Sequence, residues 1–172
     1  MTEAQLILSV ATIICSGVVS AIVTYKLNAR KDERQLLRQK LEELNLAMLR
    51  FCTQLDTNFL PYISVMTGNI TYNQALDIVL NSKDTEKNYD KISMIVNIYF
   101  PQLSSNLENI HTARGAGNEV IHDFKRFYES AGTHSQQHYQ KMSAVVNLLG
   151  KAESDFKAAI REEARKIKKI GF

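Results

Sequence analysis

The feature that most constrains this chain is an uncharged run of twenty residues, from Leu6 to Tyr25, dominated by aliphatic side chains. A helix rises about 1.5 Å per residue, so the run spans roughly 30 Å, the thickness of a bilayer's hydrocarbon core. The residues before it include Glu3 but no Lys or Arg. A secretory signal peptide, in contrast, begins with a basic segment and has a shorter apolar core. The sequence therefore predicts an uncleaved transmembrane anchor over residues 1–25 and a helical domain over residues 26–172.

Basic residues crowd the C-terminal side of this run. Residues 26–40 contain six Lys and Arg against two acidic residues. Because Lys and Arg beside a span favour the cytoplasmic side, we expect a single-pass protein with its N-terminus outside and its C-terminal domain in the cytoplasm. The basic residues expected at the membrane surface are Lys26, Arg30, Lys31 and Arg34 beside the anchor, and Arg165, Lys166, Lys168 and Lys169 near the C-terminus.

Small and hydroxyl-bearing residues recur at every fourth position within the apolar run. Positions i and i+4 share one face of a helix, and small residues there let two membrane helices approach closely. The alternative is that the hydroxyls only bond carbonyls of their own helix. The positions expected to pack between helices are Thr12, Ser16, Gly17, Ser20, Ala21 and Thr24.

The remainder of the chain has the composition of a helical domain. Two prolines and seven glycines occur in 172 residues. Such a scarcity of helix breakers favours long helices over a turn-rich β architecture. Cys15 falls within the predicted span and Cys52 on a predicted helix, so no disulfide is expected.

Apolar residues continue beyond the anchor with the heptad spacing of a coiled coil, which favours a helix that presents one stripe to a partner. No helix breaker separates this stripe from the anchor, so the first helix is expected to end near Leu60, before Pro61 and then Gly68-Asn69. The predicted helix-interface positions are Leu37, Leu41, Leu44, Met48, Phe51 and Leu55.

Local sequence signals divide the rest of the chain into three further helical segments, here called legs, each of which runs along the bundle. Thr71 and Gln74 form a capping-box pattern, which predicts a helix over about 72–81, and another helix is expected from Asp84-Thr85. Pro101 suits the first turn of the next helix, and a turn is expected over Gly132–Ser135. Gly115 and Gly117 weaken the helix that follows Pro101, which predicts a kink or a close helix crossing near residues 114–117. Short connections make neighbouring helices antiparallel. The expected fold is therefore all-α: a transmembrane helix that continues into an up-down four-helix bundle about 45 Å long.

This topology returns the basic C-terminus to the membrane side of the bundle. Polybasic segments are attracted to anionic lipid, so the C-terminal basic residues and the interleaved Ile167, Ile170 and Phe172 are candidates for membrane contact. The alternative is that they complement the helix dipole and fray in water. No nucleic-acid partner is expected.

Two Glu-x-x-His pairs, Glu108/His111 and Glu119/His122, match a ligand motif of di-iron bundles. They lie on one helix about 16 Å apart, so they cannot bind the same metal. His134 and His138 are four residues apart but lack an evident third ligand. No catalytic, cofactor-binding or metal-binding residue is therefore predicted, no cofactor is expected, and Cys52 is expected to pack beside the heptad stripe.

Residues Ile98 to Leu103, with the sequence IYFPQL, resemble a short segment of uncharacterised bacterial single-pass inner-membrane proteins with a helical cytoplasmic domain. This resemblance implies a bacterial inner-membrane location and no particular activity. We therefore expect a non-enzymatic helical bundle that acts by self-association or by docking a membrane or cytoplasmic partner at the lipid bilayer. One alternative is a membrane-perturbing effector, of a phage-defence or toxin type, whose span oligomerises. Another is a spanin-like envelope protein with reversed topology.

Overall fold

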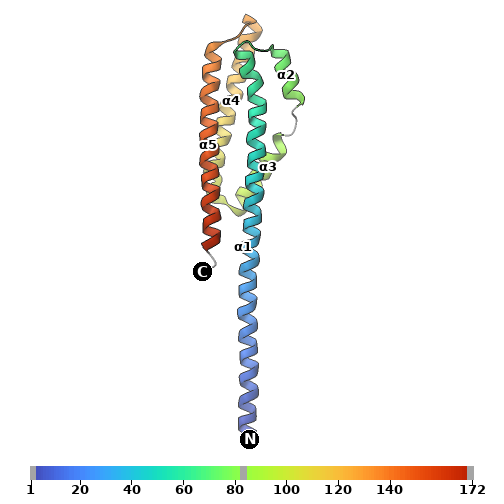
Figure 1. The fold of residues 1–172 in the computed structure, drawn as a ribbon, viewed down its shortest axis with the longest axis vertical. Helices are drawn as coiled ribbons and strands as arrows, with labels where there is room; N and C mark the ends of the chain where they lie inside the picture. Colours follow the sequence, from blue (N-terminus) through green and yellow to red (C-terminus); the bar gives the residue numbers. More distant parts are fainter. Residues whose placement is uncertain (1–2, 82–84, 170–172) are drawn as a thin grey trace. The chain divides into compact units, whose positions relative to one another are not determined.

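The computed structural model describes the backbone of residues 3–81 and 85–169, and the side chains of residues 16–81 and 88–169. Every element in these ranges is helical, so the predicted all-α fold is confirmed. The elements are α1 (Glu3–Met66), α2 (Tyr72–Asn81), α3 (Thr85–Tyr99), the 3-10 helix η1 (Pro101–Leu103), α4 (Ser104–Ala131) and α5 (Gln136–Lys169) (Figure 1). The chain divides into two compact units, Met1–Gln39 and Lys40–Phe172, and the helices after α1 all belong to the second.

Contacts at the two ends of the second unit fix the directions of its helices. At one end, the amide of Ser135, in the turn between α4 and α5, donates to the carbonyl of Met66 at 3.1 Å. At the other end, Nε2 of Gln102, before α4, donates to Oε2 of Glu163, near the end of α5, at 2.7 Å. The second unit is thus an antiparallel helical bundle, in which α2 and α3 together form one leg (Figure 1).

The prediction that the first helix ends near Leu60 is wrong, because α1 continues through Pro61 to Met66. A proline inside a helix removes a hydrogen bond and costs about 3 kcal/mol. The side chains of Tyr62, Val65 and Met66 are at most 8% exposed. Burying each large apolar side chain contributes about 1.5–3 kcal/mol, which outweighs the cost of the proline. The chain leaves the helix at Gly68, whose φ of 80° favours glycine.

The capping box predicted before α2 is confirmed. The amide of Thr71 donates to Oε1 of Gln74 at 2.8 Å, and the amide of Gln74 donates to Oγ1 of Thr71 at 3.4 Å. The predicted start of the next helix at Asp84 lies outside the described residues, and α3 is assigned from Thr85.

The next boundaries also follow the sequence. Pro101 opens η1, which leads directly into α4. Gly132, with φ of 62°, ends α4 and donates its amide to the carbonyl of Tyr128 at 2.8 Å.

The core of the second unit lies where the apolar stripes of its helices meet. On α5 the apolar residues that enter this core include Met142, Val145, Leu149, Phe156, Ile160 and Ile167, all of them buried. The close crossing predicted near 114–117 is also confirmed: a Cβ placed on Gly117 of α4 would lie 2.5 Å from Cζ of Phe59 on α1. The absent side chain of Gly117 therefore lets these two helices pack together.

Candidate functional site

The apolar segment of α1 is exposed over all the residues whose side chains are described. The bulky residues Val18, Val19, Ile22, Val23 and Tyr25 are each 50–75% exposed. Because successive residues of a helix are about 100° apart, these five occupy one half of its circumference. This half presents a continuous apolar surface.

The other half of the same segment carries the predicted packing residues. Ser16, Gly17, Ser20, Ala21 and Thr24 are all exposed, and a Cβ placed on Gly17 would meet nothing within 4 Å. Thr12, together with the rest of residues 6–15 of the predicted span, has a side chain outside the described residues. Within the part of the chain that the structure describes, no helix combines the length and apolar character needed to cross a bilayer.

The heptad stripe of α1 lies mostly inside the second unit. Leu37 is half-buried, and the other five positions are at most 5% exposed: Leu41, Leu44, Met48, Phe51 and Leu55. The partner of these five residues is thus the core formed with the chain's own helices. A second copy or a docked protein must use a different surface of the bundle.

One end of the second unit, here called the basal end, consists of Lys40, the turn Tyr99–Gln102 and the segment Arg161–Lys169 of α5. Nζ of Lys40 lies 3.1 Å from Oε2 of Glu43 and 5.8 Å from the centroid of the Tyr99 ring. The hydrogen bond from Gln102 to Glu163 joins the turn to α5. The basal end therefore includes both the start of the second unit and the end of its last helix.

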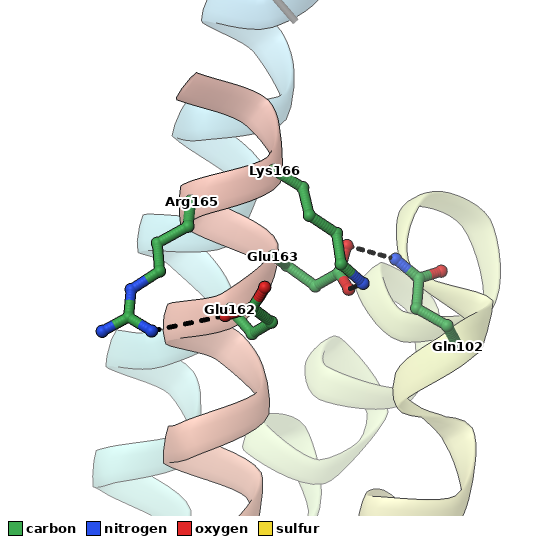
Figure 2. Close-up of polar contacts among 5 residues, drawn as sticks. All are labelled: Gln102, Glu162, Glu163, Arg165 and Lys166. Atoms are coloured by element: carbon green, nitrogen blue, oxygen red, sulfur yellow. Dashed lines mark hydrogen bonds and ion pairs between the residues drawn. The ribbon is translucent and has the colours of Figure 1, made fainter. Parts of the chain in front are cut away.

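Glu163 is the buried polar centre of this end, with 8% of its surface exposed. Its two carboxylate oxygens accept hydrogen bonds from Nε2 of Gln102 and from Nζ of Lys166 (Figure 2), each at 2.7 Å. The hydrogen bond and the charge of Glu163 raise the pKa of the Lys166 ammonium. Arg165 and Glu162, in contrast, form a mostly exposed pair at 3.4 Å, a type of pair that contributes little to stability.

The other predicted membrane-surface residues lie on the surfaces of their units. Lys26, Arg30 and Lys31 are exposed and Arg34 is half-buried. On α5, Lys168 and Lys169 are exposed and form no ion pair with any residue that the structure describes. The outward face of the last turns of α5 is therefore strongly cationic.

The histidine and glutamate pairs do not converge. Glu108, His111, Glu119 and His122 are all exposed on α4. His138 faces Ser135, with Nδ1 2.7 Å from Oγ. Among the described residues, no group of three or more His, Cys, Asp or Glu side chains is placed to hold a metal ion.

Cys52 is buried beside the heptad stripe, as predicted, and is only 4% exposed. Burial, followed by the charge of Glu153, raises the pKa of its thiol to about 12. Glu153 itself pairs with Lys157 on α5. A thiol of such high pKa is a packing group, since the nucleophile in cysteine chemistry is the thiolate.

Two features of the second unit were not predicted from the sequence. The guanidinium of Arg114 lies 5.9 Å from the centroid of the Phe51 ring and 6.0 Å from that of Tyr89. Cation–π contacts depend on which helices meet, so the only sequence signal was Arg114 itself, a charge on an apolar stripe. The second feature is a shallow groove of about 470 Å³, lined by Leu49, Arg50, Thr53, Gln54 and Asn88.

Comparisons of the chain with protein-family models, with curated proteins and with solved structures give no match.

Proposed function

We propose that the chain is a membrane-anchored, non-enzymatic helical-bundle protein of the bacterial inner membrane. In this proposal residues 1–25 span the bilayer, the N-terminus lies outside, and the bundle lies in the cytoplasm. The protein acts by self-association or by docking a protein partner at the membrane. The resemblance of residues 98–103 to bacterial single-pass proteins agrees with this location.

The observation that carries the proposal is the exposed apolar segment of α1. From Ser16 to Tyr25 all residues are uncharged and exposed, although three are valines and one is isoleucine. A helix with such a surface is unfavourable in water and favourable in lipid. The basic residues that follow, from Lys26 onward, favour the cytoplasmic side for the bundle.

Self-association is supported by the division of the segment into a bulky half and a small half. Ser16, Gly17 and Ser20 have short side chains or none, and Gly17 has open space at its Cβ position. Small residues at such positions are the usual contact surface between membrane helices.

Extraction of bacterial membranes with alkaline carbonate tests the anchor. We expect the full chain to stay with the lipid pellet, and the double variant Val19→Arg, Ile22→Arg to be released, because charges within a span oppose insertion. Leu46→Arg is the matched control, since Leu46 is a 55% exposed residue of the same helix but lies within the second unit. Release of the unchanged chain, or cleavage within the apolar segment, would overturn the proposal.

Two further measurements separate the alternatives. A reporter fused after Phe172 distinguishes a cytoplasmic bundle from a spanin-like, reversed topology. Crosslinking between copies should decrease when Ser16, Gly17 and Ser20 are changed to Leu. Loss of membrane potential on expression, abolished by these same changes, would instead identify a membrane-perturbing effector.

A further inference from the structure

We infer that the end of α5 is a docking surface for anionic lipid headgroups. In this arrangement the bundle is held against the membrane at its basal end as well as through α1. The inference rests on the proposed anchor and adds a second, electrostatic contact between this protein and the bilayer.

The cationic residues at the end of α5 share one face. With about 100° between successive residues, Arg161, Arg165, Lys168 and Lys169 fall within an arc of about 100°. All four are exposed. They lie opposite the buried stripe formed by Ile160, Glu163 and Ile167. This set of four is called the basic face below.

The basic face belongs to a packed part of the bundle. Ile167 is 3% exposed, although it is only two residues from the last residue of α5. Glu163 is fixed by Gln102, from the turn before α4. The alternative of a helix end that frays in water is therefore disfavoured, and the charges are held in a defined position.

Most of the positive charge on this face is uncompensated. Residues 161–169 contain five basic and two acidic side chains. The two acids are already engaged, Glu162 with Arg165 and Glu163 with Lys166. Arg161, Lys168 and Lys169 form no ion pair within the described part of the chain, so they are available to lipid phosphates.

The position of the basic face favours an anionic membrane, rather than RNA or an acidic protein, as its partner. The basal end includes Lys40, the first residue of the second unit, so it is the end from which the chain continues toward the anchor. Apolar side chains are also exposed on the last turns of α3, namely Met94 at 52% and Ile98 at 64%. Basic and apolar side chains together are typical of surfaces that contact the lipid interface.

A fluorophore on the end of α5 tests the inference in the full-length chain. Ala164→Cys places an environment-sensitive dye beside the basic face and removes no charge, and Cys15→Ser prevents labelling in the anchor. Ser154→Cys is the matched control, because it is exposed on the same helix, about 15 Å from Ala164. Each labelled protein is reconstituted in vesicles of phosphatidylcholine alone and in vesicles that also contain phosphatidylglycerol.

We expect the dye at residue 164, and not the dye at 154, to increase several-fold in emission when phosphatidylglycerol is present. Added salt should reverse the increase. The combined change Arg161→Gln, Lys168→Gln, Lys169→Gln should abolish it. The control is the combined change Lys125→Gln, Lys141→Gln, Lys151→Gln, which removes equal charge from exposed positions elsewhere in the second unit. This control should leave the increase in emission unchanged.

Equal emission in the two kinds of vesicle would overturn the inference, as would a larger response of residue 164 to added RNA or to an acidic protein. Flotation of the same samples reports the anchor independently. A chain that floats with both vesicles but shows no charge-dependent response retains its anchor and lacks the docking surface. A chain that does not float with phosphatidylcholine has no anchor, and the inference then fails with the proposed function.

Discussion

At the residue scale, the contact between α1 and α4 depends on the absence of a side chain at Gly117. A Cβ at this position would lie 2.5–3.2 Å from three ring atoms of Phe59, which is itself only 2% exposed. Overpacking of a core costs about 1–3 kcal/mol. We therefore expect Gly117→Ala to lower the free energy of unfolding by that amount in urea titrations.

Gly115→Ala is the matched control two residues away. A Cβ on Gly115 meets nothing within 4 Å. Alanine is favoured over glycine in a helix by about 1 kcal/mol, so this variant should be as stable as the natural chain or more stable. Equal effects of the two substitutions would show that helix propensity, and not the contact with Phe59, governs position 117.

His138 gives the bundle a dependence on pH. Its ring lies 5.5 Å from that of Phe124 and 5.3 Å from that of Phe127, measured between centroids. Burial, and secondarily the charge of Lys141, lowers the pKa of His138 below its ordinary value of 6.5, while Asp123 opposes the shift. The folded state thus binds fewer protons than the unfolded state near this pH.

The sign of the effect follows from this difference in proton binding. The stabilisation from a neutral His138 is complete above pH 6.5 and is lost as the pH falls through the lowered pKa. Unfolding free energies measured from mildly alkaline to mildly acidic pH should therefore decrease more for the natural chain than for His138→Gln. His122→Gln, at an exposed position of α4, should keep the natural pH dependence. If the unfolding free energy of His138→Gln changed with pH as much as that of the natural chain, His138 would not be the source of the pH dependence.

At the element scale, α2 is a helix of ten residues whose start is fixed by a pair of side chains. An isolated helix this short is marginal, so the cap formed by Thr71 and Gln74 should matter locally. Removing such a cap costs about 1 kcal/mol. We expect Thr71→Ala to increase hydrogen exchange of the α2 amides several-fold.

A hydroxyl elsewhere in the second unit supplies the control. Thr57 donates to the carbonyl of Thr53 within α1, at 2.9 Å. Such back-bonding inside a helix adds little stability. Thr57→Ala should leave exchange in α2 unchanged. If Thr71→Ala also left it unchanged, packing rather than the cap would hold the start of α2.

Element boundaries were predictable where a local signal determines them. The capping box placed α2, and Pro101 marked the approach to α4, because both depend on neighbours within a few residues. The boundary predicted at Pro61 was wrong for a related reason: the local cost of the proline is real, but the burial of Tyr62 and Val65 outweighs it. A boundary decided by tertiary packing cannot be derived from the residues on either side of it.

The candidate site also has features that could not be predicted from neighbouring residues, because they depend on tertiary packing. The basic residues and their grouping near the C-terminus were evident in the sequence. The burial of Glu163 was not, because its partner Gln102 is 61 residues away. The heptad positions of α1 were recognised as an interface, but periodicity alone does not say whether the partner is a second chain or, as for Phe51, the chain's own core.

At the scale of the whole molecule, the second unit has a core that extends from the basal end to the turn between α4 and α5. Ile167 is buried at the first of these ends, and Phe124, whose ring contacts His138, toward the second. A small domain built around one core is expected to unfold as a single cooperative unit. Cys52, a buried thiol of the same core, is a natural probe of that cooperativity.

The reactivity of Cys52 should report opening of the whole bundle. Raising its pKa from 9.0 to about 12 reduces the thiolate fraction at mildly alkaline pH about a thousandfold. In a Cys15→Ser background we expect alkylation of Cys52 by iodoacetamide to be at least about a thousandfold slower in buffer than in urea. An exposed cysteine introduced as Ser154→Cys should react rapidly in both solutions.

A core substitution far from the thiol shows whether the opening that exposes Cys52 is global. Ile167 lies on α5 fourteen positions beyond Glu153, the charged neighbour of the thiol, a separation of roughly 21 Å. Ile167→Val should cost about 0.5–1.5 kcal/mol, so global opening predicts that Cys52 reacts about 2- to 13-fold faster. Leu55→Ala, a substitution close to Cys52, is the comparison. If Ile167→Val left the alkylation rate of Cys52 unchanged while Leu55→Ala increased it, Cys52 would be reached through local opening, and the ends of the bundle would open independently.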